Sequence, residues 1–155
     1  MRKWGEKSLA EYSTLDPRLQ KVMDRVLQEV ADISLLKGHR GQKEQNEAYY
    51  GDPQRSKLQW PNGKHNRLPS VAVDFQPYPK PESSGKLRTS LAYVAGAAVA
   101  IGRQEGLVIR WGGDWDKDGS LLDQNFDDLF HLEIAGTIDE KTGAVFDIAH
   151  GVRDD

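Results

Sequence analysis

The segment GKHNRLPSVAVDFQPYP, residues 63–79, points to the fold because a polar turn runs directly into a short apolar strand. Branched and aromatic residues such as Val71, Val73 and Phe75 favour the strand. Asp74 interrupts this apolar run, and a buried carboxylate costs free energy unless a cation meets it. His65 lies just upstream, in the turn. We therefore expect Asp74 to face a cation near His65.

Outward from this strand, helical and extended patterns interleave along the chain. Apolar spacing predicts a helix over 17–30, with Asp16 as N-cap and Pro17 at its first position. Further helices are expected over 42–50, closed by Gly51, and over 89–106, and further strands over 32–37, 107–111 and 129–134. The pattern is typical of an α+β fold, with a small, mainly antiparallel sheet packed with about three helices.

Composition bounds the function. A chain of 155 residues fits one domain, expected to span 1–155 with its core at about 15–135; the role of 136–155 is left open. A net charge of −3 argues against nucleic-acid binding through a basic surface. Cysteine is absent from the sequence, which excludes disulfides, thiolate metal sites and cysteine nucleophiles. We expect a monomer.

Export and membrane signals are not visible in the sequence. The first residues are basic, but no apolar stretch of a signal peptide follows them, and no run is long enough to span a bilayer. We therefore expect synthesis in the cytoplasm and no membrane partner.

His65, Asp74 and His131 form a candidate metal-binding set. Two imidazoles and one carboxylate suffice for a catalytic zinc ion and leave a fourth position for water. Spacing alone leaves other interpretations open. A histidine near an aspartate is often a surface pair, and His131 in an apolar strand is often a hydrogen-bonded core residue.

Four ordered motifs add a resemblance. They are GHRGQKEQNEAYY (38–50), KHNRLPSVAVDFQPYP (64–79), RWGGDWDKDG (110–119) and DDLFHLEI (127–134). Together they resemble the zinc peptidases that include D-alanyl-D-alanine peptidases and phage L-alanyl-D-glutamate endopeptidases, and they look closest to the phage endolysin branch. The resemblance covers about residues 15–135 and implies the zinc D,D-peptidase (hedgehog-like) fold.

The resemblance also implies roles for individual residues. His65, Asp74 and His131 match the family's zinc ligands, Asp128 matches its acid/base carboxylate, and Arg40 matches an arginine that supports the reacting peptide bond. The interval from His65 to Asp74 is longer than is common in the family, which predicts a bulged loop.

Asp128 raises a geometric question. A catalytic zinc ion activates water, and a nearby carboxylate must take up the water proton and later deliver it to the leaving amine. In a regular strand, residues 128 and 131 point to opposite faces, so we expect Asp128 in the turn before the strand. Glu133 either orients a ligand imidazole or is an exposed strand residue.

A second constellation lies at residues 114–125, DWDKDGSLLDQN. Asp114, Asp116 and Asp118, followed by Gly119, match the start of a calcium-binding loop. Position twelve is Asn125 instead of glutamate, so a calcium site and an acidic solvent loop both remain open.

The most concrete prediction is a phage or prophage endolysin: a zinc-dependent endopeptidase that hydrolyses peptidoglycan stem peptides, at the L-alanyl-D-glutamate bond. Such an enzyme would wait in the host cytoplasm until a phage-encoded membrane pore releases it to the cell wall. The alternatives are a D-alanyl-D-alanine carboxypeptidase and a non-catalytic, metal-containing module that binds the cell wall.

Overall fold

The computed structural model describes residues 1–120 and 128–148. In these residues the helices are α1 (Glu6–Tyr12), α2 (Pro17–Glu29), α3 (Gln42–Tyr50) and α4 (Ser84–Gln104), with a 3-10 turn, η1 (Lys64–Asn66). The strands are β1 (Ile33–Lys37), β2 (Ala72–Pro77), β3 (Leu107–Gly112), β4 (Asp128–Ile138) and β5 (Val145–Asp147). This arrangement confirms the expected α+β class.

The strands form one sheet in the order β1-β2-β4-β3, and β5 pairs with β4. Each of these pairs is antiparallel. Successive strand residues point to opposite faces, so Val73 and Phe75 enter the core while Asp74 points to the other face. The same alternation places Leu132 in the core and His131 on the face of Asp74.

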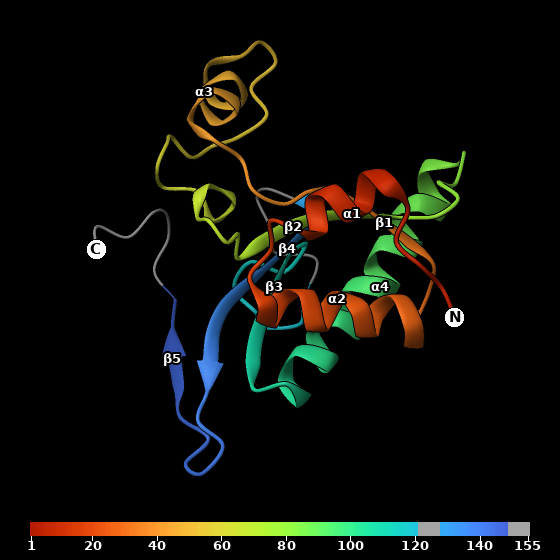
Figure 1. Ribbon diagram of the computed structural model, residues 1–155, viewed down its shortest axis with the longest axis vertical. Helices are drawn as coiled ribbons and strands as arrows, with labels where there is room; N and C mark the ends of the chain where they lie inside the picture. The colour runs from red at the N-terminus through yellow and green to blue at the C-terminus, as the bar shows by residue number, and fades with distance from the viewer. Residues whose placement is uncertain (121–127, 149–155) are drawn as a thin grey trace.

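One face of the sheet carries the hydrophobic core. The long helix α4 packs against β2, β3 and β4, and α2 packs against α4. Figure 1 shows that α3 and the loop that leads from it to η1 lie apart from α1, α2 and α4. Five apolar side chains of α2 are buried: Leu19, Val22, Met23, Val26 and Leu27. Helices thus cover the apolar face of the sheet, and the opposite face is left for polar chemistry.

Several element boundaries differ from the sequence-based expectation. The N-cap of α2 is Asp16, as predicted. Helix α4 begins at Ser84 because Ser83 acts as its N-cap, five residues before the predicted start at 89. Helix α1 was not predicted because it is short and its only buried side chain is that of Ser8. Strand β4 continues to Ile138, and β5 covers part of the segment 136–155, which the sequence left unplaced.

Candidate metal centre

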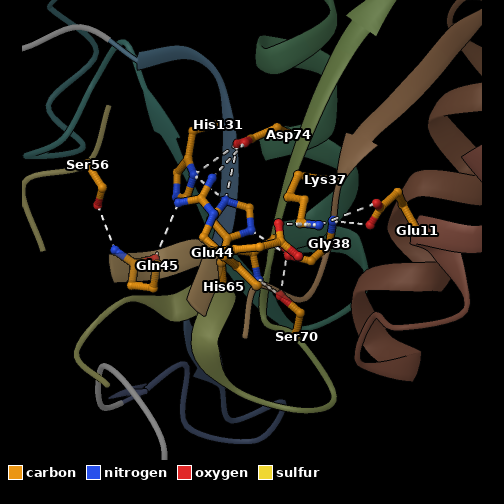
Figure 2. A network of polar contacts seen from close by, with 12 residues as sticks. Glu11, Lys37, Gly38, Glu44, Gln45, Ser56, His65, Ser70, Asp74 and His131 are labelled. Carbon is orange, nitrogen blue, oxygen red and sulfur yellow. Dashed lines mark hydrogen bonds and ion pairs between the residues drawn. The ribbon is translucent and has the colours of Figure 1, made fainter. Parts of the chain in front are cut away.

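Three side chains from separate elements meet on the polar face of the sheet. His65 lies in η1, Asp74 in β2 and His131 in β4, and Asp74 and His131 face each other across the β2–β4 pair. The Nε2 atom of His65 lies 3.2 Å from Asp74 Oδ1 and 3.2 Å from His131 Nδ1. His131 Nδ1 lies 3.3 Å from Asp74 Oδ1. Figure 2 shows the three side chains pointing toward one another.

The triangle of ligand-type atoms has the dimensions of a metal site. Zinc ligands at about 2.05 Å in tetrahedral geometry are separated by about 3.3 Å, and the three edges here are 3.2, 3.2 and 3.3 Å. Two imidazole nitrogens and one carboxylate oxygen are also donors that suit zinc. The residues therefore fit a divalent ion, and three protein ligands leave a fourth position for water or substrate.

Hydrogen bonds behind the two histidines fix which nitrogen faces the triangle. His65 Nδ1 lies 2.6 Å from the Gly38 carbonyl oxygen, and His131 Nε2 lies 2.9 Å from Glu133 Oε1. Because both partners accept hydrogen bonds, these nitrogens carry the protons. In the neutral rings, the opposite nitrogens then direct lone pairs at Asp74 and at each other. Such an arrangement requires a cation, either a proton or a metal ion.

Glu133 is held in turn by two cations. Its Oε2 atom lies 2.8 Å from Lys64 Nζ and 2.9 Å from Arg110 Nη2. Lys64 Nζ also donates to the Ile134 carbonyl oxygen at 3.0 Å. The Lys64 side chain is only 2% exposed and that of Glu133 only 4%. Lys64 therefore ties the turn that carries His65 to the strand that carries His131.

The electrostatics of the triangle favour an added positive charge. Burial by itself raises the pKa of Asp74, but the two histidines outweigh it and hold that pKa well below its usual range. Burial lowers the pKa of His131, whereas hydrogen bonds to Asp74 and Glu133 outweigh that effect and raise the pKa to about 10. Without a metal ion, the His131 imidazole is therefore protonated on both nitrogens at neutral pH and carries a positive charge.

Proton release on metal binding follows from this pKa. Between neutral pH and about 10, a divalent ion must displace the His131 proton to reach Nδ1. We expect about one proton per ion when zinc is added to metal-free protein at pH 7 in weak buffer, followed with a pH indicator. The apparent affinity should rise with pH up to that pKa. Zinc uptake without proton release at pH 7 would contradict this geometry.

Asp128 lies in β4, not in the turn before it, so that expectation was wrong. The physical reason is a large bulge: Trp111 and Gly112 are neighbours on β3, yet they pair with Leu132 and Asp128 of β4. The bulge breaks the alternation and lets Asp128 line the same cavity as His131. Gly112 is required there, since an added β-carbon would collide with the Asp128 carbonyl oxygen.

The environment of Asp128 suits proton transfer. Burial raises the pKa of its carboxyl group, and the negative charge of Asp74 raises it further, against smaller opposing effects from His131, His65 and Arg40. A carboxyl group with a raised pKa is a better proton donor near neutral pH than an ordinary aspartate. Asp128 thus lines the cavity of the triangle with its pKa shifted in the direction that favours proton donation, and its catalytic role stays a prediction.

A cavity of about 570 Å³ opens over the triangle. Its lining includes His65, Asp74, His131, Asp128 and Arg40. The Arg40 guanidinium lies with Nη2 4.0 Å from Asp74 Oδ2 and donates through Nη1 to Gln45 Oε1 at 3.3 Å. The five residues to which the resemblance gives roles in zinc binding and catalysis therefore share one cavity.

Comparison with known proteins identifies the family of the chain that carries this site. Residues 1–135 match the family model of the phage L-alanyl-D-glutamate peptidases. The chain belongs to this family. An L-alanyl-D-glutamate peptidase of Escherichia phage T5 is 29% identical over 129 residues, which cover 79% of this chain and 88% of that protein. The crystal structure of the Serratia marcescens L-Ala D-Glu endopeptidase ChiX matches with a TM-score of 0.60 at 20% identity, covering 83% of this chain and 86% of that one, and supports the fold.

The acidic loop of the peptidase brings its three aspartates together. Asp114, Asp116 and Asp118 offer carboxylate oxygens within 4.8 Å of one another. Asp114 Oδ2 accepts a hydrogen bond from the Gly119 backbone at 3.0 Å, and Gly119 has a φ of +83°, which suits the sharp turn. Asn125 lies outside the described residues. Calcium binding by this loop stays a prediction.

The contacts through which Lys64 and Arg110 hold Glu133 were not predicted from the sequence. Glu133 lies two residues after His131 on the same strand, so a shared face could be predicted from the period of two. Arg110 pairs with Glu133 through the β3–β4 register, and Lys64 reaches it from η1. Neither contact has a signal in sequence spacing, because both depend on how distant segments meet.

Replacing Glu133 with glutamine is expected to weaken zinc binding by the peptidase about tenfold to a hundredfold. The amide still accepts the His131 hydrogen bond, but it loses the charge that makes the imidazole basic. The buried Lys64 and the partly buried Arg110 also lose their carboxylate partner. Competition against a chromophoric chelator measures the affinity. Glu140→Gln, an exposed glutamate outside the cavity lining, is the matched control. An unchanged affinity in Glu133→Gln would contradict the role.

Proposed function

We propose that the peptidase is a phage endolysin that hydrolyses the L-alanyl-D-glutamate bond of peptidoglycan stem peptides with a zinc ion held by His65, Asp74 and His131. The observation that carries this proposal is the convergence of their three ligand atoms, within 3.3 Å of one another, beneath a cavity that Asp128 and Arg40 also line. Family membership supports the reaction class, and the three converging ligand atoms support a metal-dependent mechanism.

The residues around the triangle divide the chemical work. A zinc ion, when bound, would polarise the scissile carbonyl and lower the pKa of a bound water molecule. Asp128 would accept the proton of the attacking water and deliver it to the leaving amine, which departs poorly as an anion. Arg40 has a forked donor that can bind the developing negative charge or a substrate carboxylate. Glu133 and the Gly38 carbonyl oxygen hold the two imidazoles in the tautomers that coordination needs.

In this proposal the enzyme needs another protein to reach the cell wall. Among the described residues, no helix has both the length and the apolar character needed to span a bilayer. We propose that the enzyme accumulates in the host cytoplasm and reaches the wall through a phage-encoded membrane pore. Expression alone should then leave cells intact, whereas permeabilising the inner membrane should start lysis.

Mass spectrometry of digested peptidoglycan tests the scissile bond. Purified enzyme acting on isolated sacculi should produce stem peptides with a new N-terminal glutamate. Loss of a terminal alanine would instead identify a D-alanyl-D-alanine carboxypeptidase, and the absence of any cleavage would leave only a binding module. A sample stripped with a chelator should be inactive and should regain activity with zinc. Full activity after verified metal removal would overturn the zinc mechanism.

A further inference from the structure

The cavity over the metal-binding triangle is positively charged. Six cationic side chains line it, against three carboxylates: Arg40, Arg55, Lys57, Lys64, Lys80 and Arg110, and Asp74, Asp128 and Glu133. The chain as a whole carries a formal charge of −3. The positive charge is therefore concentrated at the site, and a bound divalent ion would increase it. A cavity of this kind attracts anionic substrates.

The inner cations of the cavity are already engaged. Lys64 and Arg110 contact Glu133 at 2.8 and 2.9 Å. Arg40 lies 4.0 Å from Asp74. Lys64 and Arg110 share the Glu133 carboxylate, and Arg40 faces that of Asp74. The remaining cations of the lining are Arg55, Lys57 and Lys80.

Arg55 and Lys80 differ from the inner cations. Both are exposed, and neither makes an ion pair with the residues that the structure describes. The chain is nonetheless anchored at Arg55 and two residues before Lys80. The Arg55 amide donates to the Ala48 carbonyl oxygen at 2.8 Å, and the Tyr78 amide, two residues before Lys80, donates to the Asp32 carbonyl oxygen at 3.0 Å. Two cations thus line the cavity without a carboxylate partner among residues 1–120 and 128–148.

The substrate supplies the missing charge. A glutamate residue inside a peptide uses one carboxyl group for the chain and keeps the other free, and in an alanyl-glutamate bond this carboxylate belongs to the leaving amine. We propose that Arg55 and Lys80 form a subsite for the free carboxylates on the leaving-group side of the scissile bond. The subsite makes the enzyme prefer stems whose glutamyl carboxyl group is not amidated. This inference rests on the proposed function.

A pair of soluble peptides tests the subsite. Both contain the L-alanyl-D-glutamate bond, and they differ only in whether the remaining glutamyl carboxyl group is free or amidated. The wild-type enzyme should cleave the acid with a kcat/KM about fivefold higher than the amide, which corresponds to about 1 kcal/mol for an exposed ion pair. Arg55→Gln, Lys80→Gln and the double variant are measured on both peptides. The ratio should approach one in at least one single variant and in the double variant.

The controls separate this subsite from the chemistry of the site. Arg103→Gln removes an exposed arginine outside the cavity lining and should keep the wild-type ratio. The Arg55 and Lys80 variants should lower kcat/KM for the acid more than for the amide, because only the acid carries the glutamyl carboxylate. Equal cleavage of both peptides by the wild-type enzyme, or a preserved ratio in the double variant, would overturn the subsite while leaving the proposed function standing. Failure to cleave either peptide would overturn both.

Discussion

Replacing His131 with alanine is expected to abolish metal binding and hydrolysis together. The substitution removes one of three ligand atoms and leaves His65 and Asp74, which offer too few donors to hold an ion tightly. A catalytic metal contributes several kcal/mol to transition-state stabilisation, so activity should fall at least ~10³-fold. Metal content and the rate of peptide cleavage, measured on the same preparation, provide the test.

The fold should survive His131→Ala, which makes the result interpretable. Glu133 keeps its contacts with Lys64 and Arg110, so no buried carboxylate is left without a partner. His39 provides a matched control: it is a partly buried histidine whose Nδ1 contacts the Arg67 carbonyl oxygen at 3.1 Å and which takes no part in the triangle. His39→Ala should keep both metal and activity. Retained activity in His131→Ala would remove this histidine from the metal site.

Replacing Asp128 with asparagine is expected to separate metal binding from catalysis. Asparagine has nearly the same shape but accepts no proton, so the rate should fall about 10²- to 10⁴-fold, the usual contribution of a general acid and base. Zinc content should stay at the wild-type level, because Asp128 is not among the three converging side chains. Single-turnover cleavage of a soluble peptide and metal analysis together measure the two effects.

The pH dependence adds a second readout for Asp128. As a base, it must be ionised, and burial together with the charge of Asp74 raises its pKa above the ordinary value. Activity should therefore fall as the pH drops through that raised pKa, and the residual activity of Asp128→Asn should lack this acidic limb. Asp147→Asn, an exposed aspartate in β5, serves as the control and should behave like the wild type. An Asp128→Asn enzyme with the wild-type rate would exclude the proposed role.

Much of the fold could be predicted because local signals were strong. Asp16 and Pro17 mark the start of α2, and alternation around Asp74 marks β2 with its two distinct faces. The start of α4 was harder, since Thr89 and Ser83 are both acceptable N-caps and only Ser83 makes the capping contact. Helix α1 lacks an apolar stripe of its own, so its existence depends on packing against β1.

The site shows where sequence reasoning ends. The motifs identified the three converging side chains, because residue type and order are written in the chain. The position of Asp128 was wrong, since a bulge opposite Gly112 changes the face of the strand and no spacing rule reveals it. The contacts of Lys64 and Arg110 with Glu133 depend on register and on the placement of η1. Such contacts between distant segments become visible only in three dimensions.

Anomalous diffraction at the zinc absorption edge, from crystals of the purified enzyme, tests the metal site most directly. A single peak should lie at about 2.0–2.1 Å from His65 Nε2 and His131 Nδ1 and at about 2.0–2.2 Å from an Asp74 carboxylate oxygen, with one coordination position open to the cavity. A fully loaded, active enzyme with no peak between these three side chains, or with its peak elsewhere, would contradict the proposed metal centre.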